Sequence, residues 1–296
     1  MRYAVGIDIG GTNTRVALID ETYHILERIQ FSTDVNDPEK TLDKIAEIIA
    51  GFDKDIIGVG MSCPGPLDLL EGKILTTPNL YGKWHNYEVS KQLYKRIQVP
   101  VYLDNDANLA ALAESYIGEG KDYNYVQYLT VSTGLGAGLV INKKIFLGAH
   151  GFANEVANSC MIHEGPSHGM IYPGGIEAIS SGTGILERAR KQGLIVEHAG
   201  QVNDLAVQGN ETAIQIMKEA KIYLANFIAM IQGYIDPEIF ILGGSVALKT
   251  DGFVEDVEKL VKDRVYDVVR PYVKVRKSTL NEDSGLLGAA CLVFQK

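Results

Sequence analysis

A strand, a glycine-rich turn and a returning strand occur twice in this chain, separated by about half its length. The two copies cover Arg2–Ile9, Gly10-Gly11-Thr12-Asn13 and Thr14–Asp20, and then Tyr125–Thr130, Ser132–Gly138 and Leu139–Ile145. Supersecondary units that recur at such a distance indicate two related halves. The pattern therefore predicts two domains built around similar sheets.

Further strands and helices alternate along the chain. Apolar spacing predicts helices from Pro38 and over Tyr87–Ile97, Ala107–Ile117, Asn210–Gly233, Phe253–Val265 and Ser284–Phe294. Short apolar runs predict strands over Tyr23–Phe31, Ile56–Met61, Val99–Leu103 and Glu238–Leu242. This alternation predicts an α/β fold with parallel sheet segments.

The expected domains are residues 1–118 and 119–283, with the C-terminal helix 284–296 packing back on the first. The region 151–184 has the weakest periodicity and is rich in glycine, proline and histidine, so we expect ordered functional loops there.

Bulk properties exclude several classes of protein. The 296 residues exceed one ordinary compact core, and the net charge of −9 comes from dispersed acidic residues. Nucleic acid and anionic membrane both require a basic face, so neither is expected as a partner. We expect no membrane span, because no apolar run reaches about 18 residues, and no signal peptide. Three cysteines at unrelated spacings (Cys63, Cys160, Cys291) indicate free thiols in a reducing cytoplasm.

Three glycine turns carry the chemistry: Asp8–Arg15, Ser132–Gly138 and Leu242–Ser245. Glycine lets backbone amides approach a phosphate, and Ser or Thr hydroxyls add donors. Asp8, at the end of the first strand, can hold Mg²⁺ through its water ligands. The turns are not a P-loop, which needs GxxxxGK[ST]. They are not a Rossmann fingerprint either, because a strand follows Gly138 where that fingerprint opens a helix.

Together these motifs resemble the actin/hexokinase/heat-shock-ATPase superfamily, and within it the ROK family (repressors, open reading frames, kinases) over essentially the whole chain. The matching segments are Asp8–Arg15, Cys63–Pro66, Thr77–Leu80, Asp104–Asn108, Thr133–Gly138, Asn154–Val156, Glu177 and Ile241–Gly244. The resemblance implies a two-lobed actin-like/ribonuclease H-like ATPase fold with a central cleft. Repressor members carry an added N-terminal DNA-binding segment; this chain starts at the first strand, so it is expected to be a kinase.

The resemblance also implies a role for individual residues. ATP with Mg²⁺ is expected at Asp8, Gly10, Gly11, Thr12, Asn13, Thr133, Gly134, Gly136, Gly243 and Gly244. The sugar is expected at Gly65, Asn79, Asn105, Glu155, Asn158 and Glu177. Asp106 is expected to be the catalytic base that takes the proton of the attacking hydroxyl, which is expected to be that of O6. From the residues alone, Asp104 or Asn105 could instead be a helix N-cap.

One departure from the family concerns zinc. Typical ROK kinases carry a Cys-rich zinc motif before the glutamate that matches Glu177. Here the cysteine positions hold His168, Met170 and Gly175, and Asn158 stands where the family has a zinc-site histidine. We therefore expect no structural zinc. Cys160, His163 and His168 could form an irregular metal site, although polar loop residues are the plainer interpretation.

The same asparagine bears on the substrate. In the family that histidine lies near C1 and C2 of the sugar, whereas asparagine is smaller and uncharged. The resemblance, here to the β-glucoside kinase subgroup that lacks the zinc cysteines, therefore implies a pocket that tolerates a substituent near C1 and favours a glycoside such as cellobiose. Glucose, fructose and N-acetylmannosamine stay open as acceptors. A non-catalytic sugar sensor and an ATPase acting on protein partners are the alternatives from other classes. A homodimer is expected from the family alone.

Overall fold

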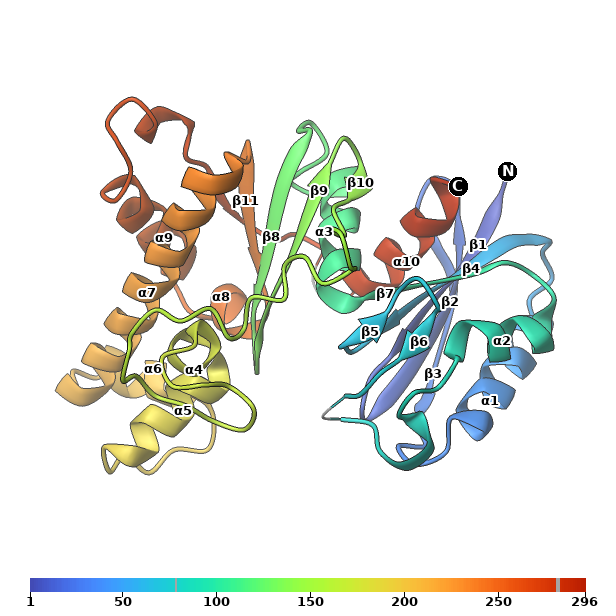
Figure 1. The fold of residues 1–296 in the computed structure, drawn as a ribbon, viewed down its shortest axis with the longest axis horizontal. Helices are drawn as coiled ribbons and strands as arrows, with labels where there is room; N and C mark the ends of the chain where they lie inside the picture. The colour runs from blue at the N-terminus through green and yellow to red at the C-terminus, as the bar shows by residue number, and fades with distance from the viewer. Residues whose placement is uncertain (78, 281–282) are drawn as a thin grey trace. The chain divides into compact units, whose positions relative to one another are not determined.

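The computed structural model describes residues 1–77, 79–280 and 283–296; Pro78 of the Thr77–Leu80 motif lies outside them. The described chain divides into two compact units (Figure 1). The first unit contains residues 1–117, 147–153 and 283–296, and the second contains 118–146 and 154–280. Segment 147–153 thus groups with the first unit, although it follows the second glycine turn in sequence.

The first unit is built on a five-stranded sheet. Its order is β3 (Ile25–Ser32), β2 (Asn13–Asp20), β1 (Tyr3–Ile9), β4 (Ile56–Cys63) and β7 (Val101–Asn105). Strands β1, β2 and β3 are antiparallel, whereas β4 and β7 run parallel to β1. The carboxyl ends of β1, β4 and β7 therefore lie at one edge of the sheet.

Helices cover both faces of this sheet. Strand side chains such as Val5, Ile7 and Met61 form a core with α1 (Pro38–Ala50) and α2 (Val89–Ile97). The opposite face is nearly flat, because Gly6 and Gly60 let α10 (Ser284–Phe294) lie directly on β1 and β4. Helix α3 (Asp106–Ile117) packs against α10. A short hairpin, β5 (Leu67–Asp68) and β6 (Lys73–Ile74), and a 3-10 turn at Gly82–Trp84 complete the unit.

The second unit repeats the same sheet. Its order is β10 (Lys144–Ile145), β9 (Leu135–Ile141), β8 (Tyr125–Val131), β11 (Ile239–Gly243) and β12 (Val275–Lys277). Again the first three strands are antiparallel and the next two are parallel. The predicted recurrence of the strand–turn–strand pattern is confirmed.

The helices that accompany this sheet in the described residues are α4 (Ile176–Ser180), α5 (Gly182–Lys191), α6 (Ala199–Val207), α7 (Glu211–Ile235), α8 (Ser245–Lys249) and α9 (Phe253–Lys262). A second 3-10 turn covers Arg270–Tyr272. The core joins strand side chains such as Leu129 and Phe240 to the apolar faces of α7 and α9. A membrane-crossing helix is absent from the described residues; even α7, with 25 residues, lacks a sufficiently apolar stretch.

The boundaries of the second turn differ from the prediction. Strand β9 begins at Leu135, so the turn is only Ser132–Gly134, and Gly136 and Gly138 lie in the strand opposite Thr130 and Tyr128. Ladder pairing overrides the turn preference of glycine here. The predicted strand Leu139–Ile145 is also wrong, because a turn at Asn142 and Lys143 separates β9 from β10. The region 151–184 is mostly loop, although α4 and the start of α5 fall within it.

Close backbone contact at Gly288 yields a stability prediction. A Cβ at Gly288 would lie 2.0 Å from the Leu109 carbonyl oxygen on α3. Gly288→Ala should therefore push α10 away from α3 and lower the free energy of unfolding by about 1–3 kcal/mol. Urea denaturation of the purified protein measures this change.

The matched control is Gly233→Ala in α7, where nothing lies within 4 Å of the new Cβ. Removing an exposed helical glycine should stabilise by up to about 1 kcal/mol. Unchanged stability of Gly288→Ala would contradict the packing account of α10.

Candidate functional site

Strand register brings three polar side chains to one edge of the first sheet. Asp8 of β1 is level with Ser62 of β4, and Ser62 is level with Asp104 of β7. Cys63, next to Ser62, pairs with Asn105, and the loop with Gly65 follows directly. Asp8, Gly65, Asn105 and the start of α3 therefore belong to one edge of one sheet.

The first glycine turn is a short connection, Gly10–Thr12, between β1 and β2. The Gly10 amide donates to the Asn13 carbonyl over 2.9 Å, and the Thr33 hydroxyl donates to the Gly10 carbonyl over 2.7 Å. Within the described chain, the Gly11 and Thr12 amides have no hydrogen-bond acceptor. Such a fixed turn with free amides suits an anion.

Asn79 lies directly against this turn. A Cβ at Gly11 would lie 2.7 Å from the Asn79 Cβ and 2.9 Å from its carbonyl oxygen. A side chain larger than hydrogen at position 11 would therefore displace a predicted sugar residue. The contact places one predicted phosphate residue next to one predicted sugar residue.

Asp8 has one carboxylate oxygen occupied and one available. Arg15 Nη2 donates to Asp8 Oδ2 over 2.5 Å, and both side chains are about one-fifth exposed. No hydrogen bond reaches Oδ1 from any residue the structure describes. Mg²⁺ usually takes one or two carboxylates, water and substrate phosphates, so a single available carboxylate fits that ion.

Asp106 opens α3 with no loop after β7. The Asn105 side chain caps the helix, because its Oδ1 accepts from the Asn108 amide over 2.7 Å. The N-cap interpretation of Asn105 is thus correct, yet its Nδ2 has no acceptor in the described chain and stays available to a ligand. Asp104 Oδ1 accepts from the Asn105 amide and from Asn108 Nδ2, each over 2.8 Å.

The two aspartates of this junction differ in their surroundings. Asp104 is 3% exposed, and its burial raises the pKa to about 6 although the two donors favour the charged form. The Asp106 side chain reaches solvent. Protein atoms around it limit its hydration, and together with the negative charge of Asp8 they raise its pKa above the ordinary range. A raised carboxyl pKa is typical of a general base.

The second glycine turn, Ser132–Gly134, is held from three sides. The Ser132 amide donates to the Gly134 carbonyl over 3.0 Å, and the Gly182 and Thr183 amides donate to the carbonyls of Ser132 and Thr133 over 2.6 and 3.1 Å. Glu177 Oε2 accepts from the Leu135 amide over 2.8 Å. The Thr133 and Gly134 amides have no acceptor within the described residues. The tip therefore resembles that of the first turn.

A cavity of about 510 Å³ adjoins this turn within the second unit. Its lining includes Ser132, Thr133, Gly182, Thr183, Glu197, His198, Asn203, Asp204, Ser245 and Lys249. The volume falls in the usual range for small-ligand sites. Apart from Thr133, none of these residues is among the predicted site residues. The sequence signal for this side of the cavity is the segment Ser181-Gly182-Thr183-Gly184, which is typical of a helix start. Ser181 is the N-cap of α5, since its side chain accepts from the Gly184 amide.

The third glycine turn has a packing reason of its own. A Cβ at Gly243 would lie 2.1 Å from the Tyr128 hydroxyl, and Gly244 has φ 85° with the Val131 carbonyl 2.5 Å from its Cβ position. These glycines let the start of α8 lie against the end of β8, which brings Ser245 to the cavity.

The predicted sugar residues of the second unit lie near the start of α4. The Glu177 amide donates to the Ala157 carbonyl over 3.2 Å, and the Ile176 amide donates to the Ser159 carbonyl over 2.9 Å. This pairing sets the loop that carries Glu155 and Asn158 against the start of α4, which carries Glu177. Asn158 Oδ1 accepts from the Tyr172 amide over 2.7 Å.

The residues weighed as an irregular metal site do not converge. Cys160 Sγ lies 3.3 Å from the Ile162 carbonyl oxygen, and His168 Nε2 lies 3.8 Å from Glu177 Oε1. In the described ranges, no group of three His, Cys, Asp or Glu side chains could hold a metal ion.

The predicted site residues thus fall into two groups. The first unit holds Asp8, Gly10, Gly11, Thr12, Asn13, Gly65, Asn79, Asn105 and Asp106, and the second holds Thr133, Gly134, Gly136, Glu155, Asn158, Glu177, Gly243 and Gly244.

The two units have the same strand order, and each has a glycine turn between the two strands that come first in its sequence, β1 and β2 or β8 and β9. This arrangement defines an actin-like ATPase fold. The chain belongs to the ROK family, whose family model matches residues 4–296.

Individual relatives agree with this assignment. The glucokinase of Thermotoga maritima is 30% identical over 314 residues, covering 99% of this chain and 97% of that enzyme. The crystal structure of a ROK hexokinase from Thermus thermophilus is 28% identical with a TM-score of 0.89, covering 99% of this chain and 98% of the other. A ROK family glucokinase from Streptomyces griseus, solved with glucose and AMPPNP, is 26% identical with a TM-score of 0.80, covering 99% and 100%. Relatives also include xylose repressors, such as that of Bacillus spizizenii, which is 25% identical and of which the chain covers 77%.

The second turn yields a binding prediction. A Cβ at Gly134 would lie 2.8 Å from Glu177 Oε2, so Gly134→Ala should displace the carboxylate that holds Leu135 and move the tip. We expect the Kd for AMPPNP to rise about tenfold or more, because the displaced tip no longer holds its amides in position for the phosphates. Isothermal titration calorimetry measures it, with Gly233→Ala as the control. A Kd within about twofold of wild type would remove the turn from the nucleotide site.

Proposed function

We propose that this protein transfers the γ-phosphoryl group of Mg·ATP to a hydroxyl of a hexose or hexoside. The observation that carries the proposal is the position of Asp106. It opens α3 at the sheet edge that also holds Asp8, in a chain of the ROK family. The kinases among its relatives support the same reaction.

The two glycine turns are the proposed phosphate contacts. Free amides at Gly11, Thr12, Thr133 and Gly134 can donate to phosphate oxygens, and the cavity beside Thr133 offers room for the nucleoside. Asp8 would hold Mg²⁺ through its water ligands, and the ion would neutralise charge on the phosphates. Arg15 keeps the Asp8 carboxylate in one orientation.

Asp106 is the proposed base. Its carboxylate accepts the proton of the sugar hydroxyl as the oxygen attacks the γ-phosphorus, and the bond from phosphorus to the ADP oxygen breaks. The Ala107 amide donates to Asp106 Oδ1 over 2.9 Å, which leaves Oδ2 for the hydroxyl. The raised pKa of Asp106 makes its carboxylate a better proton acceptor.

Substituting the base tests this role. Asp106→Asn should lower kcat by about 10²–10⁴-fold, because the amide cannot accept the proton, while sugar affinity stays nearly unchanged. A coupled assay for ADP and calorimetry with the sugar measure the two quantities. Asp68→Asn is the control, since the Asp68 carboxylate accepts from the Leu70 and Glu71 amides of the β5–β6 hairpin. Turnover near wild type in Asp106→Asn would contradict the assignment.

Asn158 supports a finer proposal, that the acceptor is a β-glucoside such as cellobiose. The residue is shorter than the histidine it replaces in the family, and its Oδ1 is engaged by the Tyr172 amide. Tyr172 itself is 72% exposed. An uncharged, anchored side chain leaves room for a substituent at C1.

A substrate panel tests the glycoside proposal. We expect kcat/KM for cellobiose to exceed that for glucose, fructose and N-acetylmannosamine, because only the disaccharide fills the room beside Asn158. Asn158→His should narrow this room and reverse the order between cellobiose and glucose. Highest kcat/KM on a free monosaccharide with the wild-type protein would refute it.

A sugar-sensing protein without catalysis is the alternative, favoured by the xylose repressors among the relatives. Sugar-dependent release of ADP separates the two, since a sensor binds the sugar without consuming ATP. Family membership also supports a homodimer in the cytoplasm, which we propose on that ground alone.

A further inference from the structure

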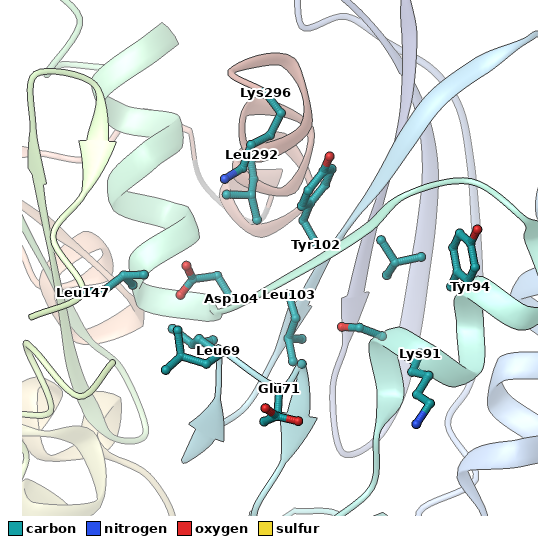
Figure 2. A pocket seen from close by; sticks show the side chains of 14 residues that line it. Leu69, Glu71, Lys91, Tyr94, Tyr102, Leu103, Asp104, Leu147, Leu292 and Lys296 are labelled. Carbon is teal, nitrogen blue, oxygen red and sulfur yellow. The ribbon is translucent and has the colours of Figure 1, made fainter. Parts of the chain in front are cut away.

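A cavity of about 430 Å³ in the first unit is lined by the residue that stands two positions before the proposed base (Figure 2). Leucines form much of its wall, namely Leu69, Leu103, Leu147 and Leu292. The carboxylate of Asp104 lies among these side chains. Asp104 is only 3% exposed, so this charge is held away from bulk water.

Both hydrogen bonds of Asp104 hold the start of α3. One oxygen, Oδ1, accepts from the Asn105 amide before the base and from Asn108 Nδ2 after it. Asn105 in turn accepts from the Asn108 amide, which closes a ring of contacts around Asp106. Asn108 is 1% exposed, and its own Oδ1 has no partner among the described residues, so Asp104 is what fixes its side chain.

We propose that Asp104 is a positioning residue for the phosphoryl-transfer reaction, which orients Asp106 through Asn105 and Asn108. The inference rests on the proposed function of Asp106. Because β7 passes into α3 without a loop, a shift of either asparagine moves the base directly. A displacement of about 1 Å at a reacting group can cost up to 10²-fold in rate.

The other charged groups of the cavity do not replace these donors. Lys91 donates to Glu88 over 3.0 Å, and Lys296 Nζ lies over the Tyr102 ring, 5.6 Å from its centre. Glu71 and Tyr94 also face the cavity, and neither bonds Asp104. The Asp104 charge is therefore stabilised by the two donors at the helix start, where the N-terminal dipole of α3 also favours an anion.

Asp104→Asn tests the proposal against a matched control. The new asparagine must direct its single oxygen to both the Asn105 amide and Asn108 Nδ2, and its NH₂ group then faces a largely apolar cavity. The hydrogen bond that holds the Asn108 side chain therefore weakens. We expect kcat to fall about tenfold, with KM for ATP and for the sugar within about twofold of wild type. The acid limb of the pH–kcat profile should also become less steep, because asparagine cannot take up the proton that Asp104 binds near its pKa of about 6. The control is Asp20→Asn, a carboxylate that is also little exposed (5%) and accepts from the Thr22 and His24 amides at the turn between β2 and β3.

The control should lose stability while kcat per folded molecule stays unchanged. A kcat for Asp104→Asn within twofold of wild type, or an equal loss in Asp20→Asn, would overturn the positioning role. A second readout does not depend on catalysis: amide hydrogen exchange at Asn105 and Asn108 should accelerate in Asp104→Asn and not in Asp20→Asn. Unchanged exchange there overturns the inference, whereas absent wild-type ADP release overturns the proposed function instead.

Discussion

The parallel register of β1, β4 and β7 is the constraint on which the first half of the site depends. It sets Asp8, Ser62 and Asp104 level with one another and so brings two acidic groups, Asp8 and Asp106, to one edge. Burial raises the pKa of Asp106, and repulsion by the Asp8 charge at the same edge raises it further. Arg15 offsets part of this repulsion by pairing with Asp8.

Glycines make this register possible by removing side chains where backbones meet. Cβ atoms at Gly60 and Gly288 would lie 1.9 and 2.0 Å from carbonyl oxygens of α10 and α3, respectively. The helices can therefore lie directly on the sheet and on each other, which fixes the direction in which α3 leaves β7. In the second unit Gly243 likewise allows close packing against Tyr128, and α8, which begins directly after Gly244, lines the cavity beside Thr133.

The sequence predicts most of the sheet strands and the start of α3, because these follow from local apolar periodicity and from an Asn-Asp pair after a strand. Strand β12 has no counterpart among the predicted strands. It places the limits of β9 incorrectly, since Gly136 and Gly138 have turn-forming character that strand pairing overrides. The cavity beside Thr133 escapes prediction for another reason. Its lining comes from five separate segments, and residues such as His198 and Lys249 carry no motif.

The sequence does not show which atoms of Asn105 form the helix cap or how deeply Asp104 is buried. A helix cap and a ligand contact need the same residue types, so the pattern alone cannot separate them. Only the hydrogen bonds show that Asn105 uses its side-chain carbonyl for the cap, while its amide nitrogen has no acceptor among the described residues. The role of Asp104 depends on its 3% exposure, which no local pattern encodes.

A crystal structure of the protein with AMPPNP, Mg²⁺ and a bound acceptor sugar tests the central claim most directly. The account predicts one sugar hydroxyl within hydrogen-bond distance of Asp106, in line with the γ-phosphate, whose oxygens accept from the amides of the Gly10–Thr12 and Ser132–Gly134 turns. A sugar bound away from Asp106, or phosphates that contact neither turn, would contradict it.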